Sequence, residues 1–400
     1  MILDTGDPEV DRLRRASATR FGADALVATT PENLLFLSGI DLVGPSIFGG
    51  HAAAVLELDT GQLSLFLPDY AAALDSVAQA QAELFFEPVI DYLGPEVVGR
   101  HLPPSHRGLV ETLSRGDIGR GVLARGLADR LDALRRRGSN IIIDDTSRLP
   151  DGLHDRVDGQ RLRQDPEAFR ALRRPKSLRE VERLTMAAKL NEQALRAAME
   201  TVAAGVPWRD VGAAWRASFA AGGGVPRFWF SAAGDRSIGI FEQRDHVLAA
   251  GELIRFECGG TLDGFWADTG RSASVSVPRD DLAARHGALV AGHDRYLDLA
   301  AAGEPLGVAV EAMYDTIRDA GFIDFPDAGW SHGIGIEAYD QPIALADPRA
   351  TLEGGEVFAL ETPCFLLGWG AMQLEDTYHH AQGELRRLTE MDREPFVLGD

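Results

Sequence analysis

Four acidic residues in the second half of the sequence stand in short apolar runs, where a folded chain would bury them. They form two pairs: Glu257 with Asp268, 11 residues apart, and Glu361 with Glu375, 14 residues apart. Both spacings allow the two carboxylates of a pair to meet across adjacent strands of a hairpin. Buried carboxylates are costly unless they are paired or bind a metal, and four that converge would repel one another. A divalent cation is the simplest compensation.

His332 lies in a glycine-rich stretch between the two pairs and adds an imidazole to the set. Four carboxylates and one imidazole form a mostly oxygen site, which suits Mn²⁺, Fe²⁺, Co²⁺ or Zn²⁺. We therefore predict one or two divalent ions held by Glu257, Asp268, His332, Glu361 and Glu375. Taken singly, each acid could instead be a solvated carboxylate or a partner in a salt bridge. His332 could instead be a hydrogen-bonded loop residue.

Two hairpins have to position these residues. The sequence predicts two strands for each hairpin, over residues 253–258 and 265–275, and over residues 357–361 and 371–376. Helical stretches near 279–302 and 306–320 separate the hairpins. This order of elements indicates an α+β domain built around a curved antiparallel sheet.

The first part of the chain has a different pattern. Residues 1 to about 170 alternate strand-like apolar runs with helical stretches, which is typical of an α/β layer arrangement. A helix is expected after Ser177, because Glu180 three residues later completes a capping-box signature. We therefore predict an N-terminal α/β domain over residues 1–172 and a catalytic domain over residues 173–400.

The balance of charges excludes several classes of function. The 400 residues include 40 Lys+Arg and 61 Asp+Glu, and the net charge of −21 argues against binding a nucleic-acid backbone. Only Lys176 and Lys189 are lysines, and neither follows a phosphate-binding glycine pattern, so P-loop and Schiff-base chemistry are not expected. The sequence shows no signal-peptide pattern and no apolar run of membrane-spanning length, and its two cysteines suit a reducing compartment. We expect a cytoplasmic protein that acts on a small molecule and binds neither nucleic acid nor a membrane.

Five short motifs in a fixed order carry a resemblance to a known family. They are Glu257-Cys258-Gly259, Ala267-Asp268-Thr269-Gly270-Arg271-Ser272, Ser331-His332-Gly333-Ile334-Gly335-Ile336, Glu361-Thr362-Pro363 and Glu375-Asp376-Thr377. In this order they resemble the creatinase/aminopeptidase-P/prolidase superfamily, and the resemblance covers essentially the whole chain. It implies a pita-bread catalytic domain behind a creatinase/prolidase-like N-terminal domain. It also implies a homodimer in which the N-terminal domain helps to close the partner's site.

Three departures from the family's motifs bear on the reaction. Glu257 stands where the family has its first metal-binding Asp, and its longer side chain would displace a metal or serve another role. The family's peptidases usually carry a histidine in the stretch that matches residues 237–241, and this chain has none there. They also place His-Glu where this chain has Tyr339-Asp340. These departures favour a small, non-peptide substrate.

The resemblance implies a hydrolase that cleaves an amide or Xaa-Pro-like C–N bond with a metal-activated water. Glu361 would be the general acid/base, His332 a ligand, and Tyr339 a donor in place of a histidine. One alternative is a metal-independent hydrolase similar to creatinase or ectoine hydrolase, with Glu257 as nucleophile or base and His332 as acid/base. Two further alternatives are a metal-dependent dimethylsulfoniopropionate lyase and a binding module like the superfamily's histone-chaperone and RNA-associated relatives.

Three more residues are candidates for substrate binding. Trp229 and Phe241 could line an apolar or cation-binding pocket, and Arg271 belongs to the second motif. Residues 329–333 fit the pattern Gly-x-Ser-x-Gly of a nucleophile elbow. An elbow needs a helix after it, and the two glycines that follow the serine make a poor helix start, so we do not expect a serine hydrolase.

Overall fold

The structure is a computed structural model that describes residues 14–15, 18–42, 51–90, 92, 101–150, 153, 162–240, 245–322, 330–381 and 383–399. The chain divides into two compact units, Met1–Arg173 and Arg174–Asp400. The division falls one residue after the boundary that the sequence indicates.

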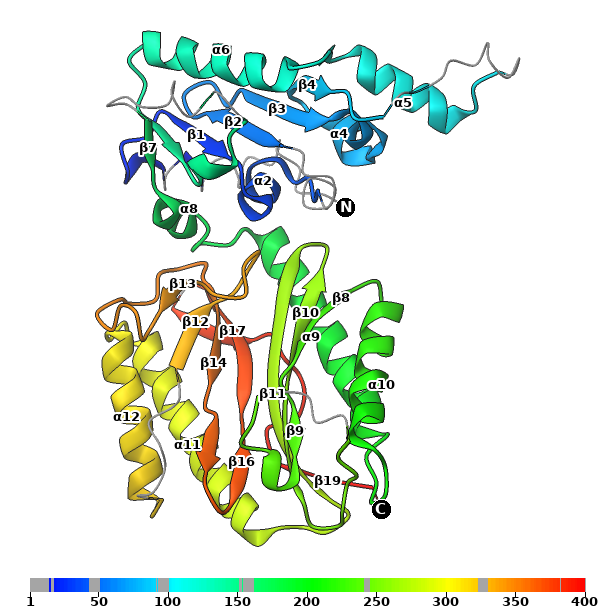
Figure 1. Cartoon of the computed structure of the whole chain (residues 1–400). Helices are drawn as coiled ribbons and strands as arrows, with labels where there is room; N and C mark the ends of the chain where they lie inside the picture. The colour runs from blue at the N-terminus through cyan, green and yellow to red at the C-terminus, as the bar shows by residue number, and fades with distance from the viewer. Residues whose placement is uncertain are drawn as a thin grey trace. The chain divides into compact units, whose positions relative to one another are not determined.

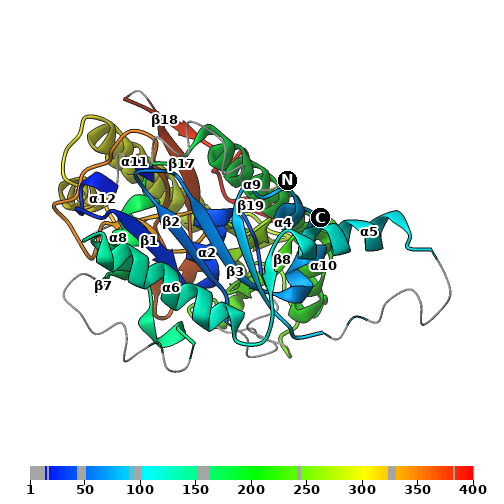
Figure 2. The ribbon, with the colours of Figure 1, turned by 90° about the horizontal axis from the view of Figure 1, so that it is seen from above.

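The first unit is an α/β arrangement around a mixed sheet. Its strands are β1 (Ala25–Ala28), β2 (Ala53–Glu57), β3 (Leu63–Pro68), β4 (Glu83–Glu87), β5 (Asp117–Ile118), β6 (Ile141–Ile143) and β7 (Leu162–Gln164), in the spatial order β5-β4-β3-β2-β1-β6-β7. Its helices are α2 (Pro31–Ser38), α4 (Asp75–Gln79), α5 (Pro104–Ser114), α6 (Val122–Arg136) and α8 (Pro166–Leu172). Helix α6 lies across the strands (Figure 2) and packs Leu127 and Leu131 into one core with Val27 and Val55.

The second unit contains a larger sheet in which the strand pairs of the described residues are antiparallel, except that β11 and β19 are parallel. Its strands are β8 (Val225–Trp229), β9 (Ala232–Ala233), β10 (Leu253–Leu262), β11 (Phe265–Val275), β12 (Trp330–Gly333), β13 (Asp340–Ile343), β14 (Val357–Glu361), β17 (Glu375–Ala381), β18 (Glu384–Arg387) and β19 (Phe396–Leu398). The main path runs β13-β12-β14-β17-β11-β10-β8. The predicted α/β domain and α+β pita-bread domain are both confirmed.

Two pairs of helices cover one face of this sheet (Figure 1): α9 (Leu178–Met199), α10 (Trp208–Ala221), α11 (Asp280–Ala301) and α12 (Leu306–Asp319). Helix α9 begins at the capping box of Ser177 and Glu180. The first pair packs on Phe256 of β10 and the second on Phe358 of β14. Because side chains alternate along a strand, the acids one residue away from such apolar positions face the other side of the sheet. None of the described helices has the length and apolar composition that a bilayer span requires.

The second predicted hairpin differs in detail from the structure. Strand β14 pairs with β17, which begins at Glu375, whereas Gly370–Met372 forms β16 in a separate hairpin with β15 (Cys364–Leu366). Pro363 follows β14 by two residues and has no N–H to continue the ladder, so the chain leaves the sheet there. His332 also lies within strand β12 rather than in a turn, because Ser331 and His332 pair with β14.

Candidate active site

Three of the predicted carboxylate ligands form a row across four adjacent strands. Glu257 on β10 pairs with Gly270 on β11, which in turn pairs with Glu375 on β17. Glu375 pairs with Glu361 on β14. Gly270 leaves room for the two acids beside it, since a Cβ at this position would come within 2.6 Å of the Gln373 side chain. The small residue therefore lets the flanking carboxylates approach each other over β11.

Asp268 and His332 lie on the same face, two residues further along the sheet. Asp268 pairs with Gly259, which places it diagonally across from Glu257. His332 on β12 pairs with Ala359, two residues before the last acid of β14. Glycine and alanine opposite these two side chains leave space around them.

The structure brings all five predicted ligand residues together. One ligand atom each from Asp268, His332 and Glu375 lie within 4.8 Å of one another. The same holds for Glu257, Glu361 and Glu375, so the two groups share Glu375. Whether these residues bind a metal is a proposal taken up below.

Burial dominates the electrostatics of this cluster, whose five side chains are at most 8% exposed. Burial raises the pKa of Glu257 to about 7, although the nearby Arg255 opposes this effect. Burial and the charges of neighbouring carboxylates also raise the pKa of Asp268, Glu361 and Glu375 well above the ordinary range. The four acids therefore cannot all be ionised together unless a cation joins them.

The imidazole of His332 has the tautomer and charge of a metal ligand. Its Nδ1 lies 3.1 Å from the carbonyl oxygen of Gly333, so Nδ1 carries the proton and Nε2 presents its lone pair to the carboxylates. Burial lowers the pKa of His332 to about 4, which keeps the ring neutral. The ring of Tyr339 stacks on it, with 4.1 Å between centroids and 20° between planes.

Glu361 receives donors from outside the cluster. The Tyr339 hydroxyl donates to Glu361 Oε1 at 3.4 Å, and the Trp330 side chain also donates to this carboxylate. Partial burial and the charge of Glu361 raise the pKa of Tyr339 well above its ordinary value, so the hydroxyl keeps its proton. Tyr339 thus places a neutral O–H group at the edge of the carboxylates.

Four buried polar atoms of the cluster have no hydrogen-bond partner among the described residues: Glu257 Oε2, Asp268 Oδ1, His332 Nε2 and Glu375 Oε1. Buried polar atoms in folded proteins are normally satisfied, so a group of four needs an explanation. When ionised, carboxylate oxygens can only accept, as does an unprotonated imidazole nitrogen, so the ionised cluster cannot satisfy itself. The donor set therefore fits a divalent cation of the Mn, Fe, Co or Zn kind.

Sequence reasoning missed three residues on the face of the cluster, each two positions before a predicted ligand: Arg255, Trp266 and Gln373. Arg255 is buried, and its Nη1 lies 3.7 Å from Glu257 Oε2 and donates to Gln373 Oε1 at 3.0 Å. The Gln373 amide in turn approaches Glu375 Oε2 at 3.4 Å. The two-residue period of a strand was the signal that could have found all three.

Trp229 does not line the cluster, and its predicted role in substrate binding is wrong. It pairs with Cys258, whose side chain points to the helix-covered face. Its indole packs between Trp208 and Trp215, with centroid distances of 5.8 and 5.6 Å. Phe241, the other predicted aromatic contact, lies outside the described residues.

Other aromatic residues lie on the face of the cluster, and two of them, Phe228 and Phe230, flank Trp229 in the sequence. Phe228 pairs with Gly259, and a Cβ on that glycine would touch the Phe228 ring at 2.5 Å. Phe228 stacks with Phe230 at 4.8 Å and with Trp266 at 6.4 Å between centroids. Phe230 is 42% exposed, so this row of rings is open to solvent at one end.

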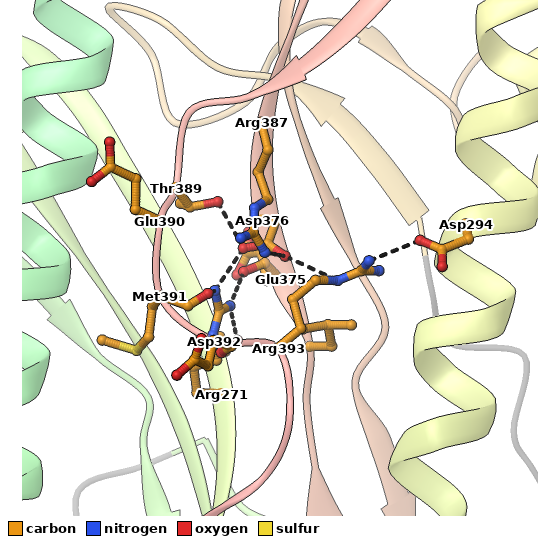
Figure 3. Close-up of polar contacts among 12 residues, drawn as sticks. Arg271, Asp294, Glu375, Asp376, Arg387, Thr389, Glu390, Met391, Asp392 and Arg393 are labelled. Carbon is orange, nitrogen blue, oxygen red and sulfur yellow. Dashed lines mark hydrogen bonds and ion pairs between the residues drawn. The ribbon is translucent and has the colours of Figure 1, made fainter.

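Arg271 is a structural anchor on the opposite face from Asp268, and its predicted role in substrate binding is also wrong. Its guanidinium is fully buried and donates to Asp376 Oδ1 at 2.6 Å (Figure 3). The remaining donors bind carbonyl groups, those of Gly270, Glu375, Met391 and Asp392. No N–H group of Arg271 faces the carboxylate cluster.

Asp376 is the centre of this second polar group. The Thr389 hydroxyl donates to Oδ1 at 2.7 Å, and Arg387 and Arg393 approach Oδ2 at 3.5 and 3.6 Å (Figure 3). Burial would raise the pKa of Asp376, but Arg271 and these donors outweigh burial, so the pKa lies below its ordinary value. The group therefore ties the segment after β18 to the back of the sheet.

Ser331 lacks the surroundings of a nucleophile. Its hydroxyl is buried and lies 2.5 Å from the Tyr296 hydroxyl. The chain continues from β12 through a turn into β13, with no helix between them in this described stretch. Gly329, the first residue of the elbow-like pattern, lies outside the described residues.

An antiparallel sheet with two helix pairs on one face and a carboxylate–imidazole cluster on the other defines a pita-bread protein of the metallopeptidase type. Residues 182–381, half of the chain, match metallopeptidase family M24, and the chain belongs to this family. The predicted superfamily is therefore confirmed.

Among curated relatives, the Xaa-Pro dipeptidase of Pyrococcus furiosus is 23% identical over 233 residues, which is 57% of this chain and 66% of the relative. The Xaa-Pro dipeptidase of Lactobacillus delbrueckii is matched over 42% of its length, and the probable dipeptidase PepE of Mycobacterium bovis over 36%. The chain therefore spans less than two thirds of each of these relatives.

Two solved structures share the fold over nearly the whole chain. The X-Pro aminopeptidase of Thermotoga maritima has a TM-score of 0.73 at 18% identity, over 96% of this chain and 100% of its own. A dipeptidase of Pyrococcus horikoshii has a TM-score of 0.74 at 17% identity, over 97% and 100%.

Proposed function

We propose that the chain is a metal-dependent hydrolase that cleaves the C–N bond of a small amide or Xaa-Pro-like substrate. The observation that carries this proposal is the group of four unpartnered, buried ligand atoms in one cluster. The family supports it, because its matched relatives include an Xaa-Pro dipeptidase.

Each residue of the cluster has a task in this proposal. The five ligand residues hold one or two divalent ions, which supply a Lewis acid and lower the pKa of a water. Glu361 takes the proton of the attacking water at a carboxylate oxygen and passes it to the leaving nitrogen. The Tyr339 hydroxyl, which keeps its proton and donates to Glu361 Oε1 at 3.4 Å, turns from that oxygen to donate its hydrogen bond to the bound substrate. Tyr339 thereby replaces a donor that the family's peptidases take from histidine.

The surroundings of the cluster favour a short substrate with an apolar group. Phe228, Phe230 and Trp266 provide adjacent ring faces on the same side of the sheet. Residues 237–240 carry no histidine, and Ile238 and Ile240 are partly exposed there. Apolar contact is the recognition that these side chains offer.

The test uses the full chain, stripped with a chelator and reloaded with Mn²⁺, Fe²⁺, Co²⁺ or Zn²⁺. Amine release is measured on Xaa-Pro dipeptides, other dipeptides and small amides. Asp268→Asn should abolish metal-dependent turnover. Asp263→Asn is the matched control on the same hairpin, because Asp263 sits at the exposed turn with φ 50°, which Asn tolerates.

Three results would overturn the proposal. Undiminished turnover by metal-free protein would favour the creatinase-like alternative, in which Glu257 and His332 act without an ion. A product formed without addition of water would favour the lyase. No turnover with any ion and any member of the panel would favour a binding module.

The homodimer and the cytoplasmic location expected from the sequence are also proposals. Light scattering on the full chain tests the first, and fractionation of the source cells tests the second.

A further inference from the structure

The cluster contains a permanent cation of its own. Arg255 is 1% exposed and lies on β10 two residues before Glu257. Its Nη2 donates to the carbonyl groups of Phe230 at 2.7 Å and Gly239 at 2.9 Å, and Nη1 donates to Gln373. These contacts fix the guanidinium beside the acids and leave none of it facing solvent.

Arg255 lies beside an acid that belongs to only one of the two candidate ligand groups. The carboxylate-only group contains Glu257, which forms the 3.7 Å ion pair with Arg255. Its second member, Glu361, already accepts from Tyr339 and Trp330. This group therefore has a positive charge and two donors before any ion binds.

The other group has no positive charge paired with its own acids, and its one donor is the Gln373 amide, which approaches Glu375 Oε2 at 3.4 Å. Asp268, His332 and Glu375 each present an unpartnered buried atom, and these are three of the four unpartnered atoms of the cluster. The fourth, Glu257 Oε2, is the atom that faces Arg255 beyond hydrogen-bond distance. A second divalent ion beside Glu257 would meet the guanidinium at short range in a buried site, where like charges repel strongly.

We propose that Arg255 takes the place of a second metal ion, so that the chain binds a single divalent ion at Asp268, His332 and Glu375. Arg255 is then a positioning residue, which holds Glu257 through the ion pair and the 237–239 turn through hydrogen bonds, and which neutralises the carboxylate-only group. Glu257 keeps an oxygen free of metal and available to the substrate. This inference rests on the proposed function only in requiring that the cluster binds metal.

The experiment counts ions. Chelator-stripped full-length protein is saturated with Mn²⁺, freed of unbound ion by gel filtration, and analysed for manganese per chain. Electron paramagnetic resonance on the same samples separates isolated Mn²⁺ from exchange-coupled pairs. The variants are Arg255→Met, which removes the charge but keeps an unbranched side chain, and Arg227→Met. Arg227 is the matched control, because it lies over the Trp266 ring at 5.9 Å on the neighbouring strand.

We expect one isolated Mn²⁺ per chain in the wild type and in Arg227→Met, and two with coupled spectra in Arg255→Met. If Arg255→Met fails to fold, Glu257→Gln and His332→Ala decide the matter. Glu257→Gln should keep the single ion, and His332→Ala should lose at least tenfold in Mn²⁺ affinity, as expected for removal of a ligand. Two ions in the wild type would overturn this inference alone. No ion in the wild type would overturn the proposed function as well.

Discussion

Replacement of Arg271 by Met tests whether this residue is an anchor of the fold. Met keeps the unbranched aliphatic part of the side chain and removes the guanidinium. The change therefore deletes the 2.6 Å ion pair with Asp376 and the hydrogen bonds to four carbonyl groups. The side chains of the carboxylate cluster lie on the opposite face of β11, and only the backbone carbonyl of Glu375 loses a hydrogen bond.

The expected loss of stability follows from the burial of the pair, whose side chains are both 0% exposed. Removing one partner of a buried ion pair costs about 3–5 kcal/mol. Asp376 keeps Arg387, Arg393 and Thr389 as neighbours, so we expect a value near the lower bound. A unit of this size loses about 2–4 °C of Tm per kcal/mol, which corresponds to a fall of about 6–12 °C.

Tryptophan fluorescence is the appropriate assay, because all six tryptophans of the sequence lie in the second unit. Urea unfolding monitored by this signal therefore follows the second unit. Arg387→Met is the matched control. It removes an arginine that lies 3.5 Å from the same carboxylate but is 31% exposed, so it should cost about 1 kcal/mol or less.

The reasoning fails if Arg271→Met changes the free energy of unfolding no more than Arg387→Met does. It also fails if the folded variant has a much higher KM with unchanged stability, since that result would indicate that Arg271 binds the substrate.

Three further predictions concern the site. Tyr339→Phe keeps the ring stacked on His332 but removes the donor, so kcat should fall about 100-fold or more with little change in Mn²⁺ affinity; full turnover would contradict the role of the hydroxyl. Ser331→Ala should keep turnover and lose about 1 kcal/mol of stability, because the hydrogen bond to Tyr296 is lost. Loss of turnover with unchanged metal content would instead support Ser331 as a nucleophile. The third prediction concerns pH in metal-free protein. The folded-state pKa of Glu257 is raised from 4.5 to about 7, so the folded form holds this proton more tightly than the unfolded form. The stability of the wild type relative to Glu257→Gln should therefore fall as pH rises through that window, by on the order of 3 kcal/mol. Urea titrations of both proteins from pH 4.5 to 7 measure the difference, and a constant difference would show that the pKa of Glu257 is not raised.

The five residues of the cluster could be predicted because their setting is unusual in a local window of sequence. An acid such as Glu257 at the end of an apolar strand must be compensated, and the spacing to Asp268 fits one hairpin. Their order along the chain then pointed to the fold. The same local signals located the start of α9 and both ends of α11 and α12 to within one residue.

The wrong predictions arose where strand parity was not applied. Arg271 is three residues from Asp268, an odd offset that places the two side chains on opposite faces of β11. Trp229 faces away because its neighbour Phe228 pairs with Gly259, a register that depends on contact between distant segments. The pairing of β14 with residues 375–379, and not with residues 371–374, likewise depends on where the chain leaves the sheet. Such pairing between distant segments cannot be predicted from a short stretch of sequence.

The origin of the five candidate ligands on five different strands has a consequence for assembly. Glu257 and Glu375 are separated by more than a hundred residues, and no two of the five lie close enough in sequence to form a local chelate. An unfolded chain therefore offers an ion only scattered single ligands. On the proposed function, metal would bind only after β10, β11, β12, β14 and β17 have closed into one sheet, unlike zinc in small fingers, which nucleates the fold. Metal binding would then report that the long-range pairing of the strands is complete. When the protein refolds, recovery of metal binding should lag behind recovery of the tryptophan signal.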